Sequence, residues 1–302
     1  MMNNRLTALA ASLLLAATPL LAQDALFRVI SVTGDSQVKR PTLASFEQAS
    51  ARMYPLGTTL RAGAASEVVL SYNNNYIFTL TGPGELLVGA GVNGPLLQLV
   101  LSQGRLNASF VKSTGDGDVV IDAPGLTCVP GSEIGMTIET TREAGGMVSS
   151  TLTFDRGAAR VSGPQFNIPA LRVGNSLRVL SALDRSLTRI TGLLGEFPVQ
   201  LDNNTEIPME FTMKPNAAIK ITRQLSAVTG REGVSILIIN ENGVGHASYS
   251  FVPGDPVLFV DGALRPLPKD ADDDEAADAQ AQPNQNQPAP AADPVWGEFP
   301  TF

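Results

Sequence analysis

The sequence has almost none of the residues from which most catalytic and metal sites are built. Among its 302 residues there is one histidine, His246, and one cysteine, Cys128. Zinc and iron sites need clusters of Cys and His, so we expect no such metal and no cofactor. One cysteine cannot form an intramolecular disulfide either, so the fold must rest on its core. We interpret Cys128, which lies in an apolar run, as a buried and inert thiol.

The single histidine also limits nucleophilic catalysis. A Ser-His-Asp triad would have to use His246, which follows Gly243 and Gly245, and no serine lies in a nucleophile-elbow motif. We interpret His246 as a turn or strand-end residue, predict no catalytic residue, and expect that the protein is not an enzyme. One alternative stays open, an exported hydrolase or carbohydrate-active protein, because two carboxylates can converge in space from any sequence spacing.

Positive charge is scarce as well. The 21 Lys and Arg residues face 29 Asp and Glu residues, which gives a net charge of −8. The arginines are scattered, and nucleic-acid binding needs a basic face, so we expect no nucleic-acid partner. The segment Gly115–Asp118 holds two carboxylates but lacks the further ligands of a calcium loop, and we interpret it as a β-turn.

Residues 1–22 have the layout of a secretory signal peptide. Arg5 precedes an apolar run from Leu6 to Ala22 that ends in small residues. We expect cleavage after Ala22 and a periplasmic or secreted protein, with no transmembrane segment after signal cleavage. The alternative is an uncleaved membrane anchor, because the run is close to the lower length limit for a membrane span.

The C-terminal part of the chain has two regions. Residues 268–294 are acidic and then rich in Pro, Gln and Ala, which predicts a disordered linker. Residues 295–302 form an aromatic peptide that contains Trp296, Phe299 and Phe302. We interpret these three aromatic residues as a weak partner-binding site for an envelope protein. The alternative is a tail that folds back onto the body.

The rest of the chain predicts a mainly β fold. Short apolar or alternating runs are separated by turns rich in glycine and asparagine. Val29–Val32 and Gln37–Lys39 flank a Thr-Gly-Asp corner, which predicts a hairpin. Val68–Tyr72 and Tyr76–Leu80 flank three asparagines, which tolerate left-handed backbone and predict a second hairpin.

One segment, residues 175–195, breaks this pattern. Its leucines and isoleucine recur at helical spacing, which predicts an amphipathic helix that begins at Asn175 or Ser176 and ends near Gly195. Residues 196–267 then read as a second, small β module. Within it the almost wholly apolar run Val234–Ile239 predicts a central strand.

Residues 27–174 carry an ordered series of glycine corners. The positions are Gly104 in LVLSQGRL, Pro124 in APG, Gly131 in VPGS and Gly157 in RGAARV. This series resembles the periplasmic FecR domain family, as does the earlier stretch from Leu56 to Leu70. The resemblance covers roughly Val29 to Val179, and Ser132 stands where the family usually has threonine.

The resemblance implies an antiparallel sandwich or roll-like FecR domain over residues 27–174 that is used for protein contacts. Familiar members also have a cytoplasmic anti-sigma segment. Only five residues precede the apolar run here, so we do not expect direct control of a sigma factor. We expect an exported, non-enzymatic module for protein binding, scaffolding or signalling in the bacterial envelope. A self-assembling surface structural protein is a further alternative.

Overall fold

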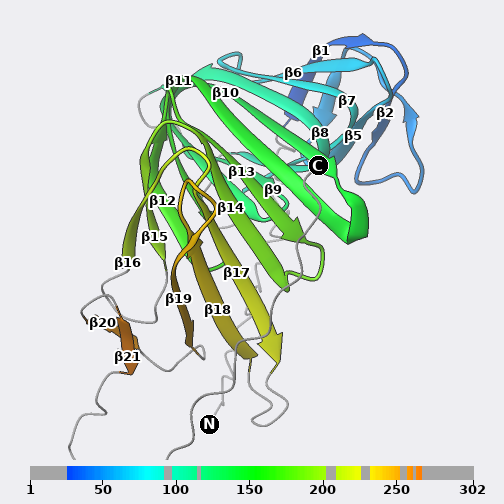
Figure 1. Cartoon of the computed structure of the whole chain (residues 1–302). Coiled ribbons are helices and arrows are strands. Elements are labelled where there is room, and N and C mark those ends of the chain that lie inside the picture. Colours follow the sequence, from blue (N-terminus) through cyan, green and yellow to red (C-terminus); the bar gives the residue numbers. More distant parts are fainter. Residues whose placement is uncertain are drawn as a thin grey trace, which may run out of the picture. The chain divides into compact units, whose positions relative to one another are not determined.

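The computed structural model describes residues 26–91, 97–113, 117–201, 209–225, 232–251, 257–260 and 263–266. All of these described residues belong to one compact unit. In the described part, every element except one short 3-10 turn, Ala144–Gly146, is a β-strand (Figure 1). The prediction of a mainly β fold is therefore confirmed. The predicted signal peptide, linker and aromatic peptide, with Trp296, Phe299 and Phe302, lie outside the described residues.

Nineteen of the strands in the described residues join one continuous sheet, and β20 and β21 form a separate pair. The first nine strands are β1 (Leu26–Thr33), β2 (Ser36–Lys39), β3 (Glu47–Gln48), β4 (Met53–Pro55), β5 (Thr58–Ala62), β6 (Glu67–Tyr72), β7 (Tyr76–Gly89), β8 (Leu97–Val111) and β9 (Val119–Ala123). The next seven are β10 (Leu126–Arg142), β11 (Met147–Gly163), β12 (Phe166–Arg172), β13 (Ser176–Ala182), β14 (Leu187–Leu194), β15 (Phe197–Leu201) and β16 (Met209–Met213). The last five are β17 (Ala218–Leu225), β18 (Glu232–Ile239), β19 (Gly245–Phe251), β20 (Val257–Val260) and β21 (Ala263–Pro266).

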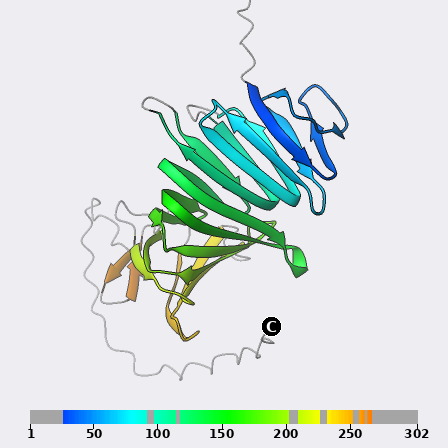
Figure 2. The same ribbon diagram turned by 90° about the horizontal axis from the view of Figure 1, so that it is seen from above.

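The strand pairings sort the large sheet into two ladders. Ladder A has the order β4-β1-β6-β7-β8-β10-β11-β13-β14-β17-β18-β19. Ladder B has the order β3-β2-β5-β7-β8-β9-β10-β11-β12-β15-β16. The pair β8–β9 is parallel and all the others are antiparallel. Strands β7, β8, β10 and β11 belong to both ladders, and Figure 2 shows the strands coloured from blue to green lying side by side.

Each of these four long strands passes from one ladder to the other at a bend that contains glycine. Gly104 has φ +97°, and a Cβ there would lie 2.5 Å from the Cα of Gly84. Gly157 has φ +79°, and a Cβ there would overlap the carbonyl oxygen of Glu133. Only glycine fits such a conformation at such a close approach. The predicted glycine corners at these positions therefore lie within continuous strands.

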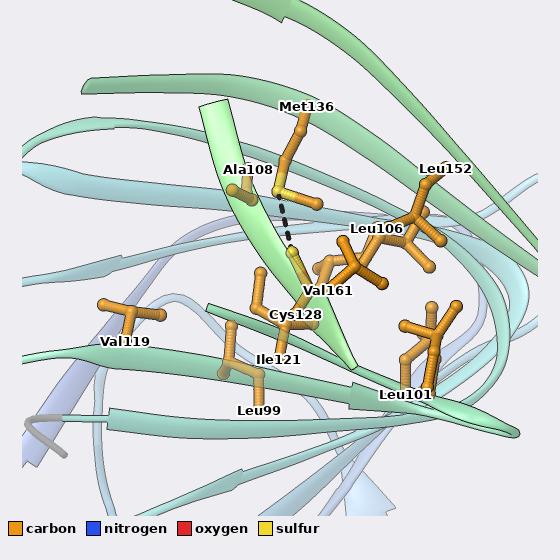
Figure 3. Packing of buried hydrophobic residues seen from close by; sticks show 14 of the residues in the cluster. Leu99, Leu101, Leu106, Ala108, Val119, Ile121, Cys128, Met136, Leu152 and Val161 are labelled. Atoms are coloured by element: carbon orange, nitrogen blue, oxygen red, sulfur yellow. Dashed lines mark hydrogen bonds between the residues drawn. The ribbon is translucent and has the colours of Figure 1, made fainter. Parts of the chain in front are cut away.

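The apolar core lies between the two ladders. Cys128, in the part of β10 that belongs to ladder B, places its Sγ 4.0 Å from the Sδ of Met136 in the ladder A part of the same strand (Figure 3). Both side chains are buried among leucine, isoleucine and valine. Burial disfavours the thiolate and raises the pKa of the Cys128 thiol. The prediction of a buried free thiol is confirmed.

The predicted amphipathic helix over residues 175–195 is wrong. The segment forms β13 and β14, joined by a turn over residues 183–186. Burial follows period two, since Leu177 and Val179 are buried and Arg178 between them is exposed. Leu183 and Leu194, two of the residues at helical spacing, are 68% and 58% exposed. The alternation of buried and exposed residues, with its Ser, Thr, Val and Ile, therefore favours strands, although the leucines recur at helical spacing.

Of the two predicted hairpins, one is confirmed. Strands β6 and β7 pair around Asn73 and Asn74, which have φ +49° and +59°. The hairpin of residues 29–39 is wrong, because β1 pairs with β4 and β6 in ladder A while β2 pairs with β3 and β5 in ladder B. The chain changes ladder at the Gly34 turn.

The C-terminal strands continue the same ladders. Strand β18 is central as predicted, since it pairs with both β17 and β19. Ladder B continues from β12 to β15 and ladder A from β14 to β17. Strand pairing therefore connects residues 27–174 with residues 196–267 directly. The domain borders at residues 174 and 196 stay a prediction.

Candidate functional site

A cleft of about 710 Å³ is lined by strands and turns that belong to both ladders. Ladder B contributes β8, β9, the first residues of β10 and the end of β11 to its lining. Ladder A contributes the end of β10, the start of β11, the end of β13 and the turn after it. A cleft of this volume is large enough for a small molecule or a short peptide segment.

The turn between β9 and β10 joins the two ladders at this cleft. Gly125 in that turn has φ +80°, and a Cβ there would lie 2.8 Å from the Cβ of Ser181 in β13. The buried Ser150 of β11 donates a hydrogen bond to the carbonyl oxygen of Pro124 at 3.0 Å. A satisfied buried hydroxyl and a tight backbone contact therefore hold the turn of one ladder against the strands of the other.

The lining combines an apolar floor with hydroxyl groups. Leu101, Leu126 and Val148 are buried residues of the core that contribute to the cleft. Ser162 and Ser181 lie at the ends of β11 and β13 and add hydroxyls. Such a lining offers apolar contact with a few polar groups, as ligand sites commonly do.

Asp122 is the one carboxylate among the described lining residues. Its Oδ2 accepts a hydrogen bond from Gln98 Nε2 at 2.7 Å. Its Oδ1 accepts one from Thr127 Oγ1 at 2.6 Å. Both oxygens are thus bound to neighbours on adjacent strands of ladder B. This carboxylate stabilises the β8–β9–β10 arrangement, and the described lining holds no second acid, histidine or cysteine that would form an acid–base pair with it.

Two arginines give the cleft its positive charge. Arg142 ends β10, and Arg185 lies in the turn between β13 and β14 with φ +61°. That turn is fixed by a hydrogen bond from the Arg185 amide to the carbonyl oxygen of Ala182 at 2.9 Å. Neither guanidinium has an ion pair or a hydrogen bond to any residue that the structure describes.

The neighbouring Asp184 forms no ion pair with Arg185. Its Oδ1 accepts a hydrogen bond from the amide of Ser186 at 2.9 Å. Hydrogen bonds from the side chain and the backbone of Ser186 lower the pKa of Asp184, because they favour its charged form. The acid thus closes the turn, and Arg185 stays available to the cleft.

The structure places the sequence-predicted residues in different regions. Pro124 lines the cleft. Gly104, Gly131 and Gly157 lie at the strand bends and line no part of it. His246 is the second residue of β19, as a strand-end interpretation predicts.

The Asp-containing turn is only partly described. Asp118 forms an ion pair with Lys112, with 2.7 Å between Oδ1 and Nζ, and Thr114 to Asp116 lie outside the described residues. Within the described ranges no group of three or more His, Cys, Asp and Glu side chains is arranged to hold a metal ion. The same ranges contain no helix long and apolar enough to cross a membrane.

The sequence offered little signal for the two cleft arginines. Arg185 lies in the segment predicted to be a helix, where it was one of several charges on a polar face. The Leu-Asp-Arg-Ser stretch is a polar interruption between two alternating runs, and that pattern indicates a turn. Arg142 is brought close to the Arg185 turn only by the register of β10, β11 and β13, which no local sequence pattern encodes.

Comparison with known proteins gives little further information. No protein-family model matches the chain, and no curated protein matches it. Among solved structures, the crystal structure of a candidate anti-sigma factor from Parabacteroides distasonis is similar over 52% of this chain and 59% of that one. The TM-score is 0.34 and the sequence identity is 6%. The similarity thus spans less than two thirds of that protein, and at this level it carries no argument about function.

Proposed function

We propose that this protein is an exported, non-enzymatic FecR-like module that binds a protein partner in the bacterial envelope. The observation that carries the proposal is the cleft lined by strands and turns of both ladders. Its described lining offers apolar groups, hydroxyls and two arginines that have no ion pair with any described residue, while Asp122 is held by Gln98 and Thr127. These groups suit recognition, and none of them is a free general base next to a nucleophile.

The FecR assignment is supported by where its motif glycines lie. Gly104 and Gly157 occupy bends at which only glycine fits, and Gly131 lies at the bend of β10 between its two ladder segments. A series of bent long strands gives a physical reason for an ordered series of glycines. We propose on this basis that residues 27–174 form the FecR-like, sandwich or roll-like domain.

Export and the aromatic peptide complete the proposal. The layout of residues 1–22 supports a signal peptide and hence a periplasmic or secreted location. Trp296, Phe299 and Phe302 supply aromatic anchors of the kind that concentrate binding energy in protein interfaces. We propose that they make a second contact with the partner. N-terminal sequencing of protein recovered from the periplasm or medium tests the export step, with Gln23 as the expected first residue.

Photo-cross-linking in intact cells tests the role of the cleft. A photoreactive amino acid replaces Leu183, which lines the cleft and is 68% exposed, or in the control Val173, which is 55% exposed and does not line it. We expect one discrete protein adduct from position 183 and none from position 173. Equal adducts at both positions, or none at either, would contradict the proposal.

A truncation after Pro294 tests the aromatic peptide separately. We expect the adduct at position 183 to persist and to weaken, because the cleft contact remains while the proposed second contact is lost. An unchanged yield would assign partner binding to the cleft alone.

A further inference from the structure

We infer that the cleft binds a ligand with a single carboxylate on an apolar body, such as a medium-chain fatty acid or the free C-terminus of an apolar peptide. The inference rests on the proposed binding role of the cleft and names the chemistry of the group that enters it. Its three supports are the positions of the two arginines, the apolar floor beneath them and the fixed negative charge on the opposite wall.

The two arginines lie on the same wall of the cleft. Strand register places Arg142 opposite Val148, and Val148 opposite Ser181 of the next strand. The turn with Arg185 follows β13 directly and lies against the turn before β11, since the Leu183 amide donates a hydrogen bond to the carbonyl oxygen of Gly146 at 3.3 Å. The ends of β10, β11 and β13 therefore present both guanidinium groups from ladder A.

A guanidinium group is well matched to a carboxylate. Its planar set of donors forms paired hydrogen bonds with the two carboxylate oxygens, which are shorter and stronger than neutral ones. The chain has fewer basic than acidic residues, 21 against 29. Two arginines that share a cleft and have no ion pair among the described residues are therefore a specific feature, and an anion fits them.

The volume and the apolar lining of the cleft favour a ligand larger than an inorganic anion. A cleft of about 710 Å³ exceeds what a carboxylate or a phosphate alone would fill. Leu101, Leu126 and Val148 line the cleft from the buried core, and Leu183, in the same turn as Arg185, lines it and is exposed. Covering Leu183 with an apolar body removes hydrocarbon surface from water. The ligand thus combines an anionic end with a hydrocarbon part.

Asp122 limits the ligand to one negative charge. It lies on β9 in ladder B, and its hydrogen bonds to Gln98 and Thr127 hold it on that wall. The described lining therefore has two positive groups and one negative group. A monocarboxylate neutralises this excess, whereas a multiply charged anion meets repulsion from Asp122.

Calorimetric titration of the purified protein tests the inference with four probes. Octanoate is compared with 1-octanol, and an acetylated Leu-Ala-Leu-Val peptide with a free C-terminus is compared with its C-terminal amide. We expect saturable binding of a carboxylate probe and binding at least about tenfold weaker for its neutral counterpart, because the charge-assisted hydrogen bonds are lost. Binding of octanoate alone assigns a fatty acid, and binding of the acid peptide alone assigns a protein C-terminus.

Matched arginine variants locate the site. The double variant Arg142→Gln with Arg185→Gln removes both cleft charges. The control Arg178→Gln removes an exposed arginine of β13 that does not line the cleft. We expect at least about tenfold weaker carboxylate binding for the double variant and unchanged binding for the control. Circular dichroism of each variant verifies that the fold is retained.

Three results would overturn the inference. They are equal binding of charged and neutral probes, unchanged affinity in the double variant, and no binding of any probe. In each of these cases a discrete adduct at position 183 in cells would still support the proposed function. Loss of that adduct with retained octanoate binding would instead contradict the protein partner and leave the carboxylate site in place.

Discussion

The backbone is tightly packed at the strand bends and loosely packed at the strand ends and turns that line the cleft. At the bends of β8 and β11, backbone lies against backbone so closely that Gly104 and Gly157 leave no room for a Cβ. At the cleft end, the turns between strands leave a hollow of about 710 Å³ lined by Arg142 and Arg185. The bends bring the backbones of neighbouring strands into close contact, while the turns leave surface that a ligand can contact.

This difference separates the residues that carry the family resemblance from those that would carry binding. Gly104, Gly131 and Gly157 are required by the path of the backbone, so their pattern indicates the fold. The cleft arginines lie at a strand end and in a turn, and the path of the backbone requires arginine at neither position, since the left-handed conformation of Arg185 favours glycine. The Ala-Pro-Gly segment around Pro124 belongs to both groups, because it is part of the motif and also lines the cleft.

The largest expected effect comes from filling a bend. Gly157→Ala places a methyl group against the carbonyl oxygen of Glu133 in a left-handed conformation. We expect a loss of more than about 4 kcal/mol in the free energy of unfolding, measured by urea unfolding with circular dichroism. The control Gly145→Ala has φ +71° and no atom within 4 Å of the new Cβ, so it costs only about 1 kcal/mol. Equal losses would refute the role assigned to close approach.

The core beside the bends gives the next largest effect. Cys128→Ser buries a hydroxyl where Met136 is the only hydrogen-bond partner of the thiol among the described residues. We expect a loss of about 2 to 3 kcal/mol in the free energy of unfolding at pH 7. Cys128→Ala adds no polar group and leaves a small cavity, so we expect a loss of about 1 kcal/mol. A serine variant as stable as the alanine variant would show that water reaches this core.

The same thiol gives a pH dependence. Burial raises the pKa of Cys128 in the folded state, whereas an unfolded thiol ionises near pH 8.5. The unfolded state therefore releases a proton above about pH 8.5 that the folded state retains, so stability is complete below that pH and falls as the pH rises. We expect a slope of about 1.4 kcal/mol per pH unit that is absent in Cys128→Ala. Parallel slopes in both proteins would show that the thiol ionises without unfolding.

A smaller effect tests how the cleft end is held. Ser150→Ala removes the 3.0 Å hydrogen bond to the carbonyl oxygen of Pro124 and also the 3.3 Å hydrogen bond between the hydroxyls of Ser150 and Thr140. We expect a loss of about 1.5 kcal/mol in the free energy of unfolding and faster amide exchange in the β9–β10 turn. The neighbouring buried Ser149, which has no side-chain hydrogen bond to any described residue, provides the control Ser149→Ala. If both variants lose equal stability, the ladders do not depend on this bond at the cleft.

Local chemistry explains which parts of the fold were predictable from sequence. Asn73 and Asn74 specify the β6–β7 hairpin by themselves, because asparagine tolerates the left-handed turn. Gly34 equally indicates a turn, but the partners of β1 and β2 come from distant segments, so their assignment to different ladders has no local signal. Pairing of neighbouring strands joined by a left-handed asparagine turn was therefore predictable, and pairing with distant segments was not.

The helix prediction failed for a related reason. The apolar residues at helical spacing are Leu180, Leu183, Leu187, Ile190 and Leu194. The same stretch also alternates, so that Leu177, Val179 and Ser181 are buried in the core. Ladder pairing on both sides of β13 and β14 favours the period-two pattern. The same error hid the place of Arg185, because a helix would not turn there.

The smallest expected effect concerns the charge carried by strands next to the cleft. Arg189 of β14 lies directly opposite Lys220 of β17, and both are exposed. Like charges directly opposite destabilise a sheet, so Lys220→Glu replaces repulsion by attraction and should raise the free energy of unfolding by about 0.5 kcal/mol. Lys220→Gln removes only the repulsion and should give about half of that gain, and 1 M salt should reduce both gains by screening. A gain in stability that persists in high salt would mean that the substitution acts through the strand propensity of residue 220. Repulsion between Arg189 and Lys220 would then cost no stability.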